Sequence, residues 1–161
     1  MSAVTDTDGR TAVPTSTETA REQLRARGIP DELHDRFPFA GTGLADRMGI
    51  VFTELTADRC VATMPVEGNT QPAGLLHGGA HVVLAETLGS TAASLWAGPD
   101  AIVVGTDVNA THHRGIREGV VTGTATPLHR GRTLATYEIV MTDEQGRRLS
   151  TARITNLIRR R

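Results

Sequence analysis

The sequence predicts an α+β domain in which a mainly antiparallel sheet wraps around one long central helix. Residues 80–97 are small and apolar and contain one formal charge, which is typical of a buried helix. Two short alternating apolar runs precede this stretch, and four β-branched runs follow it. A hairpin, a buried helix and a further group of strands together indicate a two-layer α+β architecture.

The N-terminal part is expected to lie outside this domain. Residues 1–17 are rich in Thr, Ser, Asp and Gly without an apolar period, so they are expected to be disordered. Residues 18–43 are expected to form a short helical lead-in, with helices at 18–27 and 31–37 and a stop at Pro38. The main domain is then predicted to occupy residues 44–161.

The strands and the helix of the main domain follow from turn residues and alternation. Strands at 48–55 and 59–66 are expected to form a hairpin through the polar turn at 56–58. The helix at 80–97 would be about 27 Å long and would end at Gly98 and Pro99. A four-strand meander is expected from the later runs, at 102–112, 119–128, 133–142 and 149–158.

Composition excludes several classes of function. The chain has 161 residues, a net charge of −1 and a pI near 6.6, with no basic block beyond the Arg159–Arg161 tail, which argues against a nucleic-acid scaffold. It contains no Lys, which removes Schiff-base, pyridoxal-phosphate and P-loop chemistry. The single Cys60 is expected to be a small core residue. Without an apolar leader or a membrane-spanning run, we expect a cytoplasmic protein.

A metal site is not expected from the six scattered His residues, which accompany neither a Cys cluster nor a His-Glu-x-x-His helix. His77 and His81 stand four residues apart, and this spacing leaves a ligand pair on one helical face as an alternative. Gly78 and Gly79, however, place His77 in the turn that precedes the helix.

Glu86 and Gly78 are the strongest candidates for chemistry. Glu86 is the one formally charged residue between Glu67 and Asp100, and a buried carboxylate is costly unless it is used or paired. It is therefore either a functional acid or the partner of an Arg from a later strand. Gly78 opens the helix, where an unpaired N–H could stabilise an oxyanion; alternatively, Gly78 and Gly79 only permit a tight turn.

Six segments in a fixed order also resemble those of a known family. They are 61–66, 71–79, 84–90, 104–106, 109–114 and 127–129. From about residue 44 to residue 158 the chain resembles the hotdog thioesterases of acyl and aryl thioesters. This group includes the phenylacetyl-CoA, 4-hydroxybenzoyl-CoA, dihydroxynaphthoyl-CoA and enterobactin proofreading enzymes. The resemblance implies a hotdog fold, hydrolysis of a thioester of coenzyme A or a carrier protein, no cofactor, and a homodimer that assembles into a homotetramer.

The resemblance also implies roles for individual residues. Glu86 would act as nucleophile or general base, and Ser90 would help place the water. Gln71 and His77 would steer the thioester carbonyl and hold the turn, although backbone bonds could equally satisfy them. The substrate-side candidates are Thr87 and Thr91 beside the acyl pocket, His112 and Arg114 on the coenzyme side, and Arg132. Arg suits the phosphates of coenzyme A, but Arg132 could be a solvated charge, and the Thr hydroxyls could bond the preceding helical turn.

One helix cannot complete this site alone. Gly78 and Glu86 are eight residues apart, which is about 12 Å along a helix and too far for both to contact one carbonyl. Two chains with antiparallel helices are therefore expected to share each site. Two rival functions remain, a non-catalytic acyl-CoA binding module and a hotdog hydroxyacyl-thioester dehydratase.

Overall fold

The computed structural model describes residues 17–36 and 43–160. Pro38 and nearly all of the segment expected to be disordered lie outside the described residues. The elements are, in chain order, α1 (Thr17–Ala26), the 3-10 helix η1 (Asp31–Arg36), α2 (Leu44–Arg47), β1 (Val51–Leu55), β2 (Cys60–Pro65), α3 (Gly78–Ala97), β3 (Ala101–His112), β4 (Val120–Arg130), β5 (Leu134–Thr142) and β6 (Arg148–Arg160).

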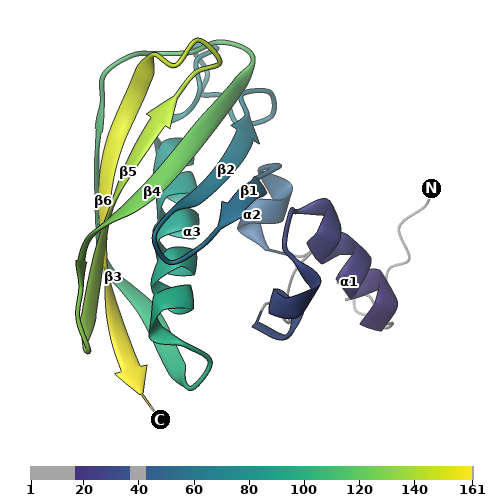
Figure 1. The fold of residues 1–161 in the computed structure, drawn as a ribbon. Coiled ribbons are helices and arrows are strands. Elements are labelled where there is room, and N and C mark those ends of the chain that lie inside the picture. Colours follow the sequence, from purple (N-terminus) through teal and green to yellow (C-terminus); the bar gives the residue numbers. More distant parts are fainter. Residues whose placement is uncertain (1–16, 37–42, 161) are drawn as a thin grey trace, which may run out of the picture.

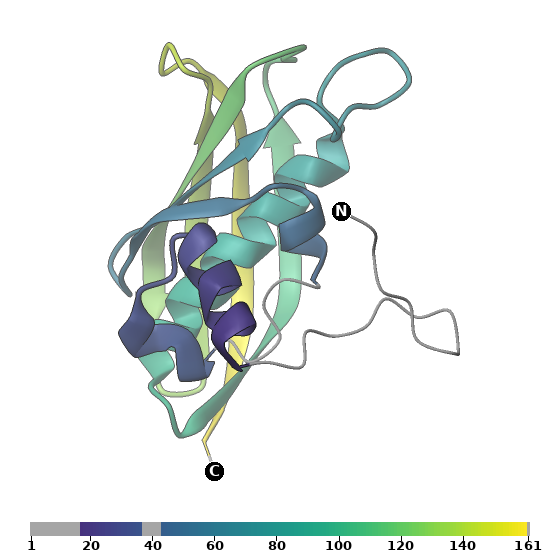
Figure 2. The same cartoon turned by 90° about the vertical axis from the view of Figure 1, so that its right-hand side faces the viewer.

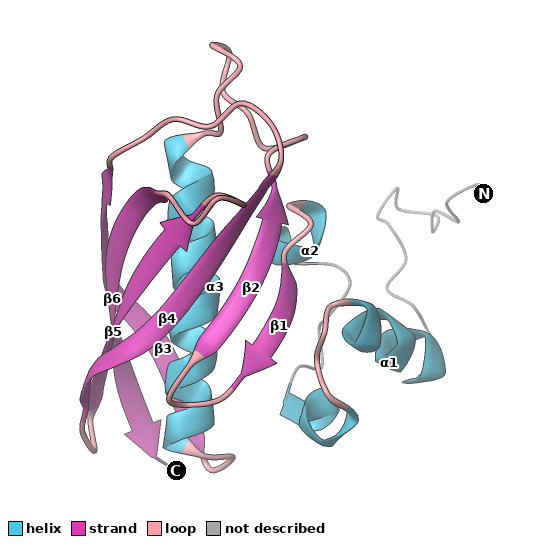
Figure 3. Cartoon of the chain, turned by 45° about the horizontal axis from the view of Figure 1, so that its top comes forward, coloured by secondary structure: helices cyan, strands magenta, loops and turns pink. Residues whose placement is uncertain are grey.

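The six strands form one antiparallel sheet in the order β1-β2-β4-β5-β6-β3. The sheet curves around α3, which contacts β2, β3, β4, β5 and β6 (Figures 1 and 2). The helices α1 and α2 lie beyond the β1 edge of the sheet (Figure 3). The α+β architecture with one long central helix is therefore as predicted.

The prediction of a four-strand meander is wrong in one respect. Strands β4, β5 and β6 pair in sequence, but β3 pairs with β6 at the far edge of the sheet and not with β4. The turns between β4, β5 and β6 are short, so consecutive strands must pair. Residues 113–119 between β3 and β4 form a longer connection, which can cross to the opposite side of the sheet.

Close packing of α3 on the sheet depends on glycines. A Cβ atom on Gly123 of β4 would lie 2.6 Å from the Cδ1 atom of Leu88, and one on Gly89 would overlap the Cγ2 atom of Ile154. Both Leu88 and Ile154 are buried in the core. The helix is therefore held against the sheet at a distance that larger side chains would not allow.

The lead-in packs against the domain through a few apolar contacts. Leu24 and Ile29 are buried, and the Phe52 N–H donates to the Arg27 carbonyl at 2.8 Å. This bond ties the segment after α1 to the edge strand β1. None of the described helices has the length and apolar character needed to cross a membrane.

Candidate functional site

The start of α3 presents a free backbone amide. His77 is the N-cap, and its Nδ1 atom accepts from the Gly79 N–H at 2.8 Å, while its carbonyl accepts from Ala80 at 2.9 Å. The Gly78 N–H meets no acceptor among the described residues. The helix begins at Gly78 and not at Ala80 as expected, so this amide carries the partial positive charge of the helix N-terminus.

A cavity of about 410 Å³ lies against this amide. Of the described part of the chain, its wall includes four of the predicted site residues and no Asp or Glu. Its lining consists of Gln71, Leu75, Leu76, Gly78, His81, His112, His113, Arg114, Gly115 and Ile116. The cavity therefore offers an amide donor, imidazoles and the exposed Arg114, but no carboxylate.

His112 lies directly over Gly78. A Cβ atom on Gly78 would be 2.9 Å from the His112 Nε2 atom. The other ring nitrogen, Nδ1, lies 3.0 Å from the Ser150 hydroxyl, whose proton goes to the Thr111 carbonyl at 3.0 Å. The sheet register pairs His112 with Ser150, which places both side chains on the inner face. The neighbouring strand β6 thus holds the His112 ring through Ser150.

His81 was missed as a site residue, because its spacing from His77 suggested only a metal ligand. Its side chain is 4% exposed, and its ring lies 5.3 Å from that of His112. Burial lowers the pKa of His81 to about 4, with proximity to His112 as a smaller cause, so the ring is neutral at pH 7. Its Nδ1 atom is buried and has no hydrogen-bond partner among the residues that the structure describes.

The residues that the structure describes include no group of three His, Cys, Asp or Glu side chains that could hold a metal ion. His77 binds the Gly79 amide, and His81 faces His112. The two side chains therefore serve different parts of the site.

Glu86 is exposed in the single chain, so the expected burial of its carboxylate is wrong. It forms no ion pair or hydrogen bond with any described residue, which also rules out the expected alternative of a core Arg partner. The physical reason is the position of the sheet, which covers α3 on the side of Ala85 and Leu88 and leaves Glu86 on the other side. Its Oε1 atom would lie 3.6 Å from a Cβ atom on Gly105 of β3.

The polar side chains near Glu86 differ in their surroundings. Ser90 is half-buried and donates its hydroxyl proton to the Asn156 Oδ1 atom at 3.0 Å, so it offers only lone pairs to a nearby water. Thr87 is half-buried, whereas Thr91 is buried and is less accessible than Glu86 and Thr87. Asn156 was not predicted, and its buried Nδ2 atom has no hydrogen-bond partner within residues 17–36 and 43–160.

The predicted residues thus form two groups within one chain. Gln71, Gly78, His112 and Arg114 surround the cavity, and Glu86 and Ser90 lie further along α3. Arg132 belongs to neither group. It follows Gly131 in the turn after β4, and the Gly131 carbonyl accepts from Trp96 Nε1 at 3.3 Å near the C-terminal end of α3.

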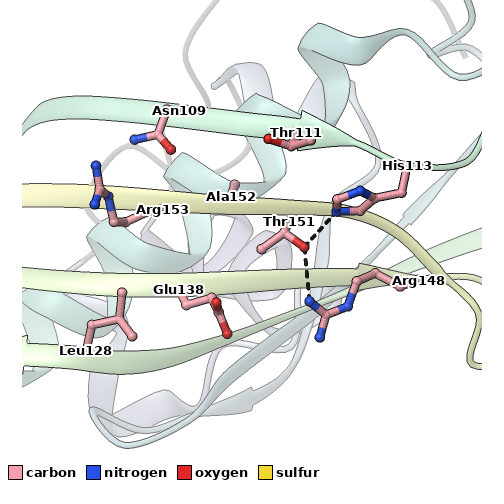
Figure 4. Close-up of a pocket in the computed structure, with 9 residues that line it drawn as sticks. All are labelled: Asn109, Thr111, His113, Leu128, Glu138, Arg148, Thr151, Ala152 and Arg153. Atoms are coloured by element: carbon pink, nitrogen blue, oxygen red, sulfur yellow. Dashed lines mark hydrogen bonds between the residues drawn. The ribbon is translucent and has the colours of Figure 1, made fainter.

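A second depression, of about 710 Å³, lies on the outer face of the sheet and was not predicted (Figure 4). The Thr151 hydroxyl there lies 3.0 Å from His113 Nε2 and accepts from Arg148 at 3.1 Å. The imidazoles of His112 and His113 therefore pair with successive residues of β6 on opposite faces of the sheet, Ser150 and Thr151, although His113 also lines the cavity beside Gly78.

A long helix enclosed by an antiparallel sheet, with a free amide at its start beside a cavity, is the arrangement of a hotdog protein that acts on thioesters. The model of the thioesterase superfamily matches residues 73–150. The proofreading thioesterase EntH of Cronobacter sakazakii is 50% identical over 116 residues, which are 71% of this chain and 85% of that protein.

Two solved structures agree. The thioesterase HI1161 from Haemophilus influenzae has a TM-score of 0.74 and 36% identity, and the match covers 80% of this chain and 90% of that one. A mutant of the thioesterase PA1618 from Pseudomonas aeruginosa has a TM-score of 0.74 and 38% identity, covering 82% and 96%. The chain belongs to the thioesterase superfamily and is a thioester hydrolase with the hotdog fold, as the resemblance implies.

Proposed function

We propose that this protein hydrolyses an acyl or aryl thioester of coenzyme A or of a carrier protein at a site shared by two copies of the chain. The Gly78 N–H of one copy stabilises the oxyanion. Glu86 of the second copy acts as nucleophile or as general base on water. The product is a free acid, and the thiol leaves without a strong general acid because thiol pKa values lie near 8.5.

The observation that carries this proposal is the separation of donor and acid within one chain. The cavity beside Gly78 contains no carboxylate, while Glu86 is exposed and unpaired among the described residues, about 12 Å along the same helix. Gly78 and Glu86 of the same chain therefore cannot both contact one thioester carbonyl. A two-fold axis that runs the α3 helices antiparallel would bring each Glu86 to the partner's cavity.

The edge strand β3 supports a dimer beside Glu86. Ile102 is 48% exposed and Val104 is 50% exposed, and both lie on a strand whose outer edge has no partner in the sheet. Exposed apolar edge strands are ready sites for pairing with another chain. Gly105, which is close to Glu86, lies on the same strand. Pairing at β3 would therefore bury the apolar edge and bring the partner's acid near the site.

Substrate contacts follow from the remaining groups. Gln71, which lines the cavity, bonds the thioester carbonyl, and Ser90 accepts a hydrogen bond from the attacking water. Thr87 and Thr91 lie along the helix beside Glu86, where they would flank the acyl group. Arg114 is exposed at the cavity wall, where it can bind a phosphate of coenzyme A or of a phosphopantetheine arm. We place Arg132 near the phosphates only in the assembled dimer or homotetramer.

The acid is tested with Glu86→Gln, which keeps the shape of the side chain and removes its charge. We expect a loss of at least about 100-fold in turnover over a panel of acyl-CoA and aryl-CoA thioesters. Glu144→Gln, at an exposed position in the turn between β5 and β6, is the matched control and should keep full activity. Equal rates for wild type and Glu86→Gln would exclude Glu86 from the reaction.

Sharing of the site is tested by mixing two inactive variants. A Gly78→Val chain and a Glu86→Gln chain each form inactive dimers, but a mixed dimer retains one site with an intact Gly78 and an intact Glu86. Random assortment of equal amounts should restore about a quarter of the wild-type activity. If each site is built within one chain, the mixture stays inactive.

A further inference from the structure

The hydrogen bonds around Ser150 fix the position of a proton on His112. A serine hydroxyl has one proton to donate, and the Ser150 proton goes to the Thr111 carbonyl at 3.0 Å. A carbonyl oxygen can only accept. At its 3.0 Å contact with His112 Nδ1, Ser150 must therefore be the acceptor and Nδ1 the donor.

This bond selects one tautomer of the neutral imidazole. With the proton on Nδ1, the Nε2 atom carries a lone pair and no hydrogen. Nε2 is the ring atom closest to Gly78, at 2.9 Å from the position of a Cβ atom there. The cavity wall next to the free amide of Gly78 therefore contains a hydrogen-bond acceptor.

Ser150 is well placed to accept the hydrogen bond from His112 Nδ1. It is completely buried and is the cross-strand partner of His112 in the register of β3 and β6. The only other side chain recorded in ring contact with His112 among the described residues is His81, which is itself neutral at pH 7. No described carboxylate bonds to His112, so Ser150 alone holds the Nδ1 proton.

We propose that Ser150 is a positioning residue that holds a proton on Nδ1 of His112, so that in the neutral imidazole Nε2 accepts a hydrogen bond from an O–H or N–H group of the bound thioester. Two parts of a substrate can supply that donor. One is a hydroxyl group on the acyl moiety, and the other is the amide N–H of the pantetheine arm, which thioesters of coenzyme A and of carrier proteins share. The role of the lone pair rests on the proposed thioester hydrolysis, whereas the position of the proton does not.

The proton is located by nitrogen-15 NMR of protein labelled in histidine, at a pH where the ring is neutral. The two ring nitrogens have different shifts according to which one carries the proton, and the His112→Gln spectrum assigns the signals. We expect the Nδ1–H tautomer in the wild type and a shift towards Nε2–H in Ser150→Ala. An Nε2–H wild type, or the same tautomer in both proteins, would overturn the role of Ser150 whether or not the protein is active on any thioester.

Kinetics then identify the donor on the substrate. Hydroxyacyl thioesters are compared with their deoxy analogues, and N-acetylcysteamine thioesters are compared with S-ethyl thioesters, which lack the amide. Ser150→Ala should lower kcat/KM by roughly tenfold, the scale of one hydrogen bond, for substrates that carry the donor, and by less than about twofold for substrates that lack it, so only one of the two pairs should show a difference. The pair that shows this selectivity names the donor, and equal losses on all four substrates would refute the accepting role of Nε2.

The outer face of the sheet provides a matched control. Thr151 follows Ser150 in the sequence, and its hydroxyl pairs with His113, the residue after His112 (Figure 4). Thr151→Val removes this hydroxyl. This variant should leave both the His112 tautomer and the substrate selectivity unchanged. Ser150→Thr keeps the hydroxyl and should keep the wild-type tautomer. If Ser150→Ala does not fold, the wild-type and Ser150→Thr spectra still decide the proposal, since Nε2–H in either one contradicts it.

Discussion

Gly78 and His112 are packed so closely that one added methyl group would meet the ring. A Cβ atom on Gly78 would lie 2.9 Å from His112 Nε2 and 3.2 Å from Cδ2. The proposed oxyanion donor and the imidazole are therefore too close together for a side chain at position 78 to fit without moving the ring. Replacing either side of this contact should change the chemistry of the site more than the stability of the fold.

Gly78→Ala should separate activity from stability. The methyl group pushes the His112 ring away and blocks approach to the amide, so kcat should fall by about 100- to 1000-fold, as for loss of an oxyanion donor. Alanine is a better helix former than glycine by about 1 kcal/mol, so the melting temperature should hold or rise. Steady-state kinetics and thermal unfolding measure the two effects, and full turnover by Gly78→Ala would contradict the oxyanion role.

Gly89→Ala should do the opposite and destabilise the fold. Its Cβ atom would overlap the Cγ2 atom of the buried Ile154, so the helix and sheet must separate locally. Overpacking of this kind costs about 1 to 3 kcal/mol. Gly43→Ala is the control, because among the described residues its Cβ atom would meet only the Asp46 carboxylate, at 3.4 Å. Urea unfolding should show a loss for Gly89→Ala alone, and equal stabilities would mean that the interface adapts.

The sequence predicts the elements of this fold better than their arrangement. Alternation and turn residues locate the strands, but they do not say that β3 pairs with β6, because pairing across the sheet depends on the path of the connection at 113–119. Burial of Glu86 was predicted wrongly for a related reason. Helix α3 is rich in Ala, Gly, Ser and Thr on all sides, so no polar stripe marks the side that the sheet leaves uncovered.

Two unpredicted polar residues nevertheless had a signal in the sequence. Along β6 the inward positions are Ser150, Ala152, Ile154, Asn156 and Ile158, and all five are buried. Ser150 and Asn156 are therefore polar residues in apolar positions, which calls for hydrogen-bond partners. Those partners, His112 and Ser90, are 38 and 66 residues away in sequence and come together only through the folded sheet.

Cys60 should be unreactive in the folded protein. The side chain is completely buried, and burial raises the pKa of its thiol to about 12, with the charge of Glu54 as a smaller cause. Thiol reagents attack the thiolate, which is then scarce at pH 8. Labelling with a disulfide reagent should be negligible in native buffer and complete in guanidinium. Rapid labelling of the native protein would show that β2 opens locally.

His81 should make the fold sensitive to acid. Its pKa is lowered to about 4 in the folded chain, chiefly by burial, whereas the unfolded value is near 6.5. Because the folded state resists protonation, the contribution is complete above about pH 6.5 and is lost as the pH falls towards 4. At pH 5 the loss amounts to at most about 2 kcal/mol, and to less where water from the cavity reaches the ring.

The comparison that isolates this effect is His81→Leu, which removes the titrating ring and its unpaired Nδ1 atom. Urea unfolding at pH 7.5 and pH 5 should show the wild type losing more stability than the variant between the two conditions. The carboxylates titrate in both proteins, so their contribution to the loss of stability cancels when the two losses are subtracted. The prediction fails if the variant and the wild type lose the same amount, since His81 would then have an ordinary pKa in a solvated ring.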